Sequence, residues 1–422
     1  MKNRIRSFFA KEGIKSIISS LLCILGGMLV GFLVLLVIAL VSEDIPVAHA
    51  FKGLRIILSG PFAPLATSGS NINIMRILGN MLFQAAPLLM TGLSVAIAFK
   101  TGLFNIGAPG QFLMGAMGAI ITAHSIPSAP QTAILVWILS VAVGTVCGML
   151  WGLIPGFFKA ILNVNEVIVC IMSNWIAANL VSWVFSANRR FTDSSSGRTM
   201  YALKTSVNGV TTPKLGLDQI FKGSDIDIGI LIAIAVAIIM YIMMSKTTFG
   251  YELKASGYNK HAAKYAGMNE KRSIMVSMAI AGGLAAMGAT LYYLNAGSDF
   301  TWDTYNKLPA YGFNGIPVAL LASSNPLGVI FGSVFLRYVD LGGYYLSGMT
   351  NYNEYVSDLI VAVIVYFAGF SMLIKMLLSR RKAAKTAKAT AAQAQAQSAA
   401  DAQPVQSQQP DADTEGKEDK DQ

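Results

Sequence analysis

The chain has 422 residues, of which 54% are hydrophobic and 13% are charged, and its formal net charge is +10. This composition excludes an ordinary water-soluble globule, which would have no interior large enough for so much apolar surface. The lysines and arginines occur in short blocks between apolar runs, so we interpret them as signals of membrane topology and not as a nucleic-acid surface.

The first apolar run, residues 17–41, follows a basic start at residues 1–16. A secretory signal has an apolar region of roughly 7 to 15 residues, whereas a membrane-spanning helix needs about 20. The run is therefore predicted to be a retained first span. Residues 1–16 are predicted to form a cytoplasmic amino terminus.

Further apolar runs of spanning or near-spanning length follow along the chain, at residues 77–99, 102–123, 132–158, 167–185, 228–244, 274–294 and 356–378. The stretch 309–339 is too long for one upright helix, and Ser323-Ser324-Asn325-Pro326 is a turn signal inside it. Splitting the stretch at Asn325-Pro326 gives about ten spans. The predicted fold is an all-α integral membrane domain over residues 17–378, with discontinuous helices.

Charge at the two ends of the apolar part supports an even number of crossings. The basic amino terminus and the cluster Arg380-Arg381-Lys382 should both face the cytoplasm. The loop at residues 188–227 counts against this topology, because it would lie outside although it carries six basic residues. Long loops weigh less in orientation than short ones, so the topology is kept.

The last segment, residues 379–422, changes abruptly to Ala, Lys and Gln and then to Asp, Glu, Gln and Pro. Such a composition cannot bury enough apolar surface to offset the entropy of ordering the chain. The segment is predicted to be a disordered cytoplasmic tail.

Sequence features of nucleotide, metal and ion-coupling sites are missing. No GxxxxGK[ST] phosphate loop occurs, so the chain cannot cradle ATP in the usual way. The three cysteines and three histidines are scattered, which gives no support to a metal-dependent enzyme. The predicted spans hold no ladder of ionisable residues, and Glu166, Arg337 and Asp358 fall near predicted span ends. This argues against proton or sodium coupling and for a neutral solute.

Residues 100–111 place three glycines, a proline and two amides, Asn105 and Gln111, where an apolar span should run. A continuous helix is not expected there. Irregular backbone at membrane depth is tolerated where it is buried in protein or lines a cavity, so the segment is a pathway candidate. A tight cytoplasmic turn between two ordinary helices is the alternative, and spacing alone does not separate the two.

A second interrupted element, residues 312–317 followed by 323–326, also has Phe-Asn beside Gly and includes Asn314. Paired broken helices point to a site at the middle of the membrane in transporters built from repeats. Between these elements, Asn165 and Glu166 open a span in which Asn174 lies deeper. Capping is the favoured role of Asn165 and Glu166, and hydrogen bonding between helices is the simplest role of Asn174.

Gly144, Gly148, Gly152 and Gly156 recur at every fourth residue and predict a helix face that a neighbouring backbone approaches closely. Gly282 with Ala286 suggests the same for a later span. The loop at residues 246–272 is predicted to form two short helices broken at Gly257, with Asn259 as a cap and Gly267 as a terminator. The larger side chains of this loop favour docking of a cytoplasmic partner over an amphipathic segment on the membrane surface. These side chains are Tyr251, Leu253, Tyr258, Tyr265 and Met268.

Four short motifs together resemble the permeases of nucleoside-type ABC importers, in the group that also serves simple sugars and branched-chain amino acids. They are Gly102-Leu103-Phe104-Asn105-Ile106-Gly107 with Gly110-Gln111, Asn165-Glu166-Val167-Ile168, Ala262-Ala263-Lys264-Tyr265-Ala266-Gly267-Met268-Asn269, and Gly312-Phe313-Asn314-Gly315-Ile316 with Val318-Ala319-Leu320-Leu321. Pro109 departs from the pattern, because such proteins often have an acidic residue there.

The resemblance implies an ABC importer permease fold in a bacterial cell membrane, with neither a catalytic residue nor a cofactor in this chain. Its expected partners are a second, related permease, a cytoplasmic ATPase that binds ATP, and an extracellular substrate-binding lipoprotein. Nucleosides are the expected solute and sugars or branched-chain amino acids the alternatives. An ion-coupled secondary transporter and a membrane-embedded enzyme are the competing classes. The sequence does not decide whether the second permease is a copy of this chain.

Overall fold

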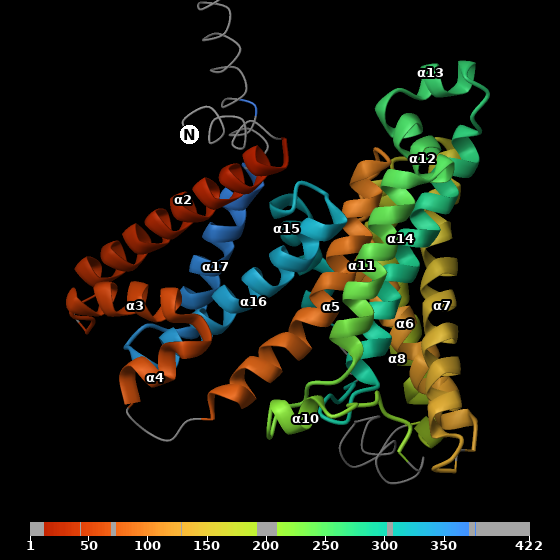
Figure 1. Cartoon of the computed structure of the whole chain (residues 1–422). Coiled ribbons are helices and arrows are strands. Elements are labelled where there is room, and N and C mark those ends of the chain that lie inside the picture. Colours follow the sequence, from red (N-terminus) through yellow and green to blue (C-terminus); the bar gives the residue numbers. More distant parts are fainter. Residues whose placement is uncertain are drawn as a thin grey trace, which may run out of the picture. The chain divides into compact units, whose positions relative to one another are not determined.

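The computed structural model describes residues 12–42, 44–68, 73–127, 129–191, 209–301, 307–370 and Met376, and the regular elements within these ranges are helices (Figure 1). The helices are α2 (Glu12–Val41), α3 (Ala48–Ser59), α4 (Ala63–Ser68), α5 (Ile74–Lys100), α6 (Ala108–Ser125), α7 (Ala133–Leu162), α8 (Glu166–Ala187), α10 (Leu217–Ile220), α11 (Gly229–Lys246), α12 (Thr248–Tyr258), α13 (Lys260–Tyr265), α14 (Glu270–Tyr293), α15 (Ala310–Leu321), α16 (Pro326–Met349) and α17 (Glu354–Gly369), with short 3-10 turns at Gly60–Phe62 and Arg189–Phe191.

All described residues except Met376 belong to one compact unit, Met1–Met372. The predicted amino terminus at residues 1–16 lies mostly outside the described residues, and the predicted tail at residues 379–422 lies wholly outside them. The division at residues 17–378 therefore stays a prediction. The all-helical class of the chain is confirmed for the described part.

Five described helices, α5, α7, α8, α11 and α14, are long and apolar enough to cross a membrane. The pair α15 and α16 meets the same test when taken together, although it is bent by 120° at its break. The break lies at the predicted turn. However, the 12 residues of α15 rise only about 18 Å, less than the roughly 30 Å of hydrocarbon, so α15 is not an upright span by itself. The count of about ten spans stays a prediction.

Helices α5, α6, α7 and α14 pack together, and α14 contacts each of the other three. The predicted glycine face of α7 explains how two backbones come so close. A Cβ atom placed at Gly144, Gly148 or Gly152 would collide with Thr290, Ala286 or Met278 of α14, respectively. The packing role of these glycines is therefore confirmed.

A second group of helices forms around α16, which packs against α3, α5, α15 and α17. Its core includes Leu35, Ile57, Val339, Leu346 and Ile360, all of them buried. The hydroxyl of Tyr352 donates to the carbonyl of Leu35 at 2.9 Å, which joins the α16–α17 connection to α2. Through its contacts with α5, α16 joins this group to the helices around α14.

Helices α12 and α13 lie at one end of α11, and the loop that carries α10 lies at its other end (Figure 1). This arrangement separates the predicted cytoplasmic loop from the predicted outside loop. The loop beside α10 is held to the first part of α5, since the side chain of Asn80 accepts a hydrogen bond from the backbone N–H of Asp225 at 2.9 Å.

Candidate functional site

The connection between α5 and α6 is the predicted break, and it is buried in protein. Helix α5 ends at Lys100, α6 begins at Ala108, and Gly102 between them has φ of +72°, which favours glycine. Asn105 and Gln111 are both 0% exposed and form a reciprocal amide pair. Asn105 Nδ2 donates to Gln111 Oε1 at 2.7 Å, and Gln111 Nε2 donates to Asn105 Oδ1 at 3.0 Å.

Asn174 of α8 completes this buried amide cluster. Its Oδ1 accepts from the backbone N–H of Gly110 at 2.9 Å, and its Nδ2 donates to the carbonyl of Ile106 at 3.0 Å. The side chain thus satisfies backbone groups that the interruption of the helix leaves free. Three of the four predicted pathway residues are therefore brought together, and each amide has hydrogen-bond partners within the protein.

Pro109, which departs from the family pattern, fits its position. It is the second residue of α6, where a backbone N–H would have no partner within the helix, so its missing donor removes no helical hydrogen bond. Gly312 of α15 packs directly against the backbone of Pro109, and Gly315 packs against Thr91 of α5. The two interrupted elements of the chain therefore contact each other.

Asn314, the fourth predicted pathway residue, lies apart from the amide cluster. Its side chain is exposed and borders a cavity of about 400 Å³, here called the inner cavity. The residues that line this cavity come from α5, α15, α16 and α17, and they are Leu88, Tyr311, Asn314, Pro317, Leu336, Arg337, Asp340, Asp358 and Ala362.

A second cavity of about 830 Å³, here called the outer cavity, lies between the first half of α5 and α16. It is lined by Asn73, Arg76, Ile77, Asn80, Met81, Gln84, Arg337, Leu341, Tyr344 and Tyr345. The sequence-based prediction missed this site. A signal was available, because Asn73, Arg76, Asn80 and Gln84 are spaced by three or four residues and so share one face of α5.

Arg337 borders both cavities, and its position corrects an expectation. The sequence places it near the end of a span, but α16 runs from Pro326 to Met349 and puts Arg337 in its middle. Its Nη1 pairs with Asp340 Oδ2, one turn further along the helix. An opposite charge within contact distance offsets part of the cost of a guanidinium at membrane depth.

The loop between α11 and α14 folds into α12 and α13, as the sequence predicts. Asn259 caps α13, since its side chain accepts from the N–H of Ala262 at 3.0 Å, and Gly267 follows with φ of +80°. Helix α12 ends at Tyr258, one residue after the predicted break.

The five side chains predicted for docking divide into two kinds. The rings of Tyr251, Tyr258 and Tyr265 are 63%, 88% and 94% exposed. Leu253 is 1% exposed, within the main core, and Met268 is half-buried. Only the tyrosines are therefore free for a partner to contact, while Leu253 anchors α12 to the rest of the protein.

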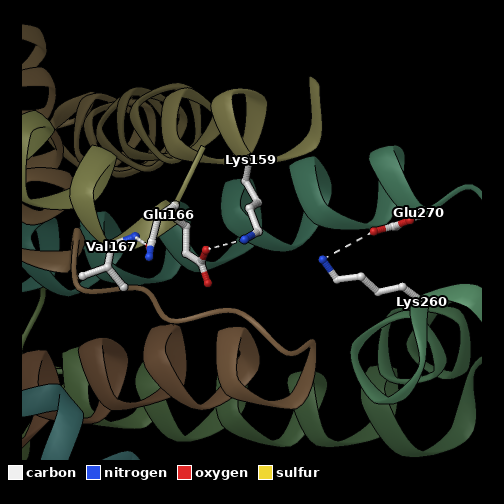
Figure 2. Close-up of polar contacts among 6 residues, drawn as sticks. Lys159, Glu166, Val167, Lys260 and Glu270 are labelled. Carbon is white, nitrogen blue, oxygen red and sulfur yellow. Dashed lines mark hydrogen bonds and ion pairs between the residues drawn. The ribbon is translucent and has the colours of Figure 1, made fainter. Parts of the chain in front are cut away.

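Ion pairs hold the neighbouring helix ends at the same end of the protein (Figure 2). Lys159 near the end of α7 lies 2.9 Å from Glu166 at the start of α8, and Lys260 of α13 lies 3.5 Å from Glu270 of α14. The side chain of Asn165 accepts from the N–H of Val167 at 2.9 Å. This confirms the capping role predicted for Asn165.

Apolar helices interrupted at a buried amide cluster, two cavities bordered by polar and charged side chains, and an exposed aromatic loop at one end fit a membrane transport subunit. The chain belongs to the family described as branched-chain amino acid transport system / permease component, whose model matches residues 77–369. It is thus a multi-pass protein of the plasma membrane and a transport component, and ATP hydrolysis takes place in a separate ATPase subunit.

Curated relatives agree with this family. The nucleoside ABC transporter permease protein NupB of Lactococcus lactis is 32% identical over 76% of this chain and 86% of NupB. The guanosine ABC transporter permease protein NupP of Bacillus subtilis is 32% identical over 72% of this chain and 84% of NupP. The glucose ABC transporter permease protein TsgB13 of Haloferax volcanii is 29% identical over 69% of this chain and 75% of TsgB13.

The two bacteria with the nucleoside and guanosine permeases each hold a second relative of the same kind. In Lactococcus lactis it is the nucleoside permease NupC, 22% identical over 62% of this chain and 80% of NupC. In Bacillus subtilis it is the guanosine permease NupQ, 25% identical over 61% of this chain and 78% of NupQ.

Proposed function

We propose that the chain is one of two permease subunits of an importer that takes up nucleosides at the expense of ATP. The similarity to NupB carries the choice of solute, since it extends over 76% of this chain and 86% of the relative. The guanosine permease NupP supports it at the same identity. The glucose permease TsgB13 makes sugars the second candidate, and the family description adds branched-chain amino acids.

The proposed partners are a second permease, an ATPase and an extracellular substrate-binding lipoprotein. The pairs of permeases in two bacteria support a second subunit that is related to this chain but different from it. The exposed tyrosines of α12 and α13 support docking of the ATPase at that end. In this proposal, movement of the ATPase pushes α12 and α13, and the helices then expose the pathway first to one side and then to the other.

The predicted pathway residues have different support. Asn314 borders a cavity, which favours direct contact with a passing solute. Asn105, Gln111 and Asn174 are buried and bonded to their surroundings, so we propose that they act in transport by holding the interrupted backbone beside the route.

Uptake of labelled solutes tests the proposed function. Cells that lack this chain should lose uptake of guanosine, adenosine and uridine but not of glucose or leucine, and a plasmid copy should restore it. A variant of the partner ATPase without its phosphate-loop lysine should abolish uptake while the chain is still inserted. Unchanged uptake of every nucleoside in the deletion strain, or uptake driven by an ion gradient without the ATPase, would contradict the proposal.

A further inference from the structure

The two short helices at the docking end are anchored to the protein to different extents. Helix α12 packs on α5, α11 and α14, and it buries Gly250, Leu253 and Ser256. Helix α13 packs on α12 and α14, and of its six residues, all of which the structure describes, only Ala263 is buried. Apolar burial therefore fixes α12 but contributes little to the position of α13. Polar contacts are left to decide where α13 lies.

Lys260 of α13 provides such a contact. Its side chain extends from α13 toward the turn between α7 and α8, and Glu270 points toward its ammonium group (Figure 2). Lys260 Nζ lies 3.5 Å from Glu270 Oε1 at the start of α14. The positive charge of Lys260 also acts on the carboxylate of Glu166 at the start of α8. Lys260 is thus attracted by carboxylates of two long helices.

Glu166 also interacts with Lys159 at the end of α7. The charged atoms of this pair are 2.9 Å apart, and the side chains of Lys159 and Glu166 are only 19% and 14% exposed. Salt screens such a pair much less than an exposed pair. The side chains of Lys260 and Glu270 are 45% and 30% exposed, so their contact is weaker. The four charges sum to zero, and the most exposed of these side chains is the lysine on α13.

Helix α8 connects these charges to the buried amide cluster. Glu166 is its first residue, and Asn174 lies about two turns later. Asn174 holds the start of α6 through the N–H of Gly110 and the carbonyl of Ile106. Rigid helices carry displacements between distant sites. A shift at the start of α8 would therefore reach the break between α5 and α6.

We propose that Lys260 is a positioning residue that orients α13 for the ATPase and couples movement of α13 to α8 through Glu166. This inference rests on the proposed function, because it takes the ATPase to contact α13. In this arrangement Tyr265 contacts the ATPase, whereas Lys260 faces the spanning helices. When the ATPase moves α13, the attraction of Lys260 for the two carboxylates differs between the two positions, and the start of α8 follows.

Hydrogen exchange tests the connection between α13 and α8 without reference to a solute. In the chain purified with its bound partners, Lys260→Met and Glu166→Gln should each speed exchange of the backbone N–H groups of residues 260–265. The expected increase is about threefold, as for the loss of one partly exposed ion pair. Lys159→Met should leave this exchange unchanged, because it breaks the buried pair but keeps the attraction between Glu166 and Lys260. Unchanged exchange in Glu166→Gln would overturn the connection.

Coupled uptake tests the role of Lys260 in transport. In proteoliposomes that hold the complete importer, Lys260→Met should still bind the ATPase and hydrolyse ATP. Its uptake of guanosine per ATP hydrolysed should fall about threefold, and Lys260→Arg, which keeps the charge, should restore most of it. Lys271→Met is the matched control, because Lys271 is exposed beside Glu270 and forms no ion pair with the described residues. An equal fall in Lys271→Met would overturn the positioning role.

A double variant tests whether Lys260 acts through Glu166. Lys260→Met with Glu166→Gln should take up no less guanosine per ATP than the weaker of the two single variants, since both substitutions remove the same interaction. Losses that multiply would overturn coupling through Glu166. Loss of the ATPase from Lys260→Met would show that this lysine binds the ATPase directly, which would overturn the positioning role but not the proposed function.

The same experiments separate this inference from the proposed function. If ATP drives uptake of glucose rather than guanosine, the proposed solute is wrong, and the ratio of solute to ATP measured with glucose tests Lys260 in the same way. If no ATPase binds the unmodified chain, the proposed function and the coupling role both fail. The connection between α13 and α8 then stands or falls on hydrogen exchange alone.

Discussion

At the scale of single residues, the buried side-chain amides of Asn105 and Gln111 bond to each other beside the break in the helix. Their reciprocal pair uses two donors and two acceptors, and Asn105 also donates to Ser94 at 2.9 Å. The sequence correctly indicated that these amides accompany a break in the helix. It could not indicate that they bond to each other, because this depends on how the five residues between them pass from the irregular connection into the first turn of α6.

Substitution of Asn105 by leucine is expected to impair transport while the protein still inserts. The change leaves Gln111 buried without its two partners and should destabilise the α5–α6 connection by about 2 to 3 kcal/mol. Guanosine uptake and the amount of chain in the membrane fraction measure the two effects. Asn179→Leu is the matched control, because that asparagine bonds only to its own helix. Normal uptake by Asn105→Leu would remove the break from the transport pathway.

At the scale of helices, sequence periodicity predicted faces and breaks better than it predicted lengths. The glycine face of α7, the cap at Asn165 and the turn before Pro326 follow from local chemistry and occur as predicted. The sequence did not predict that α15 is too short to span the membrane by itself and meets α16 at a bend of 120°, since hydropathy does not report the angle between two apolar helices. Nor did it predict the polar face of α5, because the asparagine and glutamine side chains on this face are uncharged and the helix as a whole is still apolar.

Gly148→Leu is expected to disrupt the packing of α7 on α14. The new side chain would collide with Ala286, and a contact between two backbones leaves no room to repack, so the loss of stability should be about 3 kcal/mol. Thermal unfolding in detergent measures it. Gly348→Leu is the control, because nothing lies within 4 Å of a Cβ atom there, and its midpoint should stay near that of the unmodified protein. Equal midpoints for all three would contradict the packing argument.

At the scale of the whole molecule, the chain is a transport component, and ATP hydrolysis takes place in a separate subunit. The path and the docking end of this chain are parts of the proposed function. Family membership settled the class, whereas the solute depends on relatives and on the chemistry of the cavities. The four scattered motifs indicated the family from the sequence. They did not locate the cavities, because these lie between helices from distant parts of the chain and depend on how α16 packs against α5.

The tyrosines of α12 and α13 provide the test at this scale. The double variant Tyr258→Ala with Tyr265→Ala should insert into the membrane normally but no longer co-purify with the ATPase, and its guanosine uptake should fall at least tenfold. The reason is that exposed aromatic rings dominate the energetics of such contacts. Tyr366→Ala, at an exposed ring of α17, is the control. Retention of the ATPase by the double variant would show that docking takes place elsewhere.

The closeness of Gly102 and Gly257 has a mechanical consequence. A Cβ atom at Gly102 would lie 2.8 Å from the carbonyl oxygen of Gly257, so the main chain of α12 rests on the main chain just beyond α5. The hydroxyls of Thr101 and Ser277 meet beside it. Side chains can absorb a small displacement by changing rotamer, but main-chain atoms in contact cannot. In the proposed function, a push on α12 would therefore pass directly to the carboxyl end of α5, and α5 would connect the proposed docking end to the cavities.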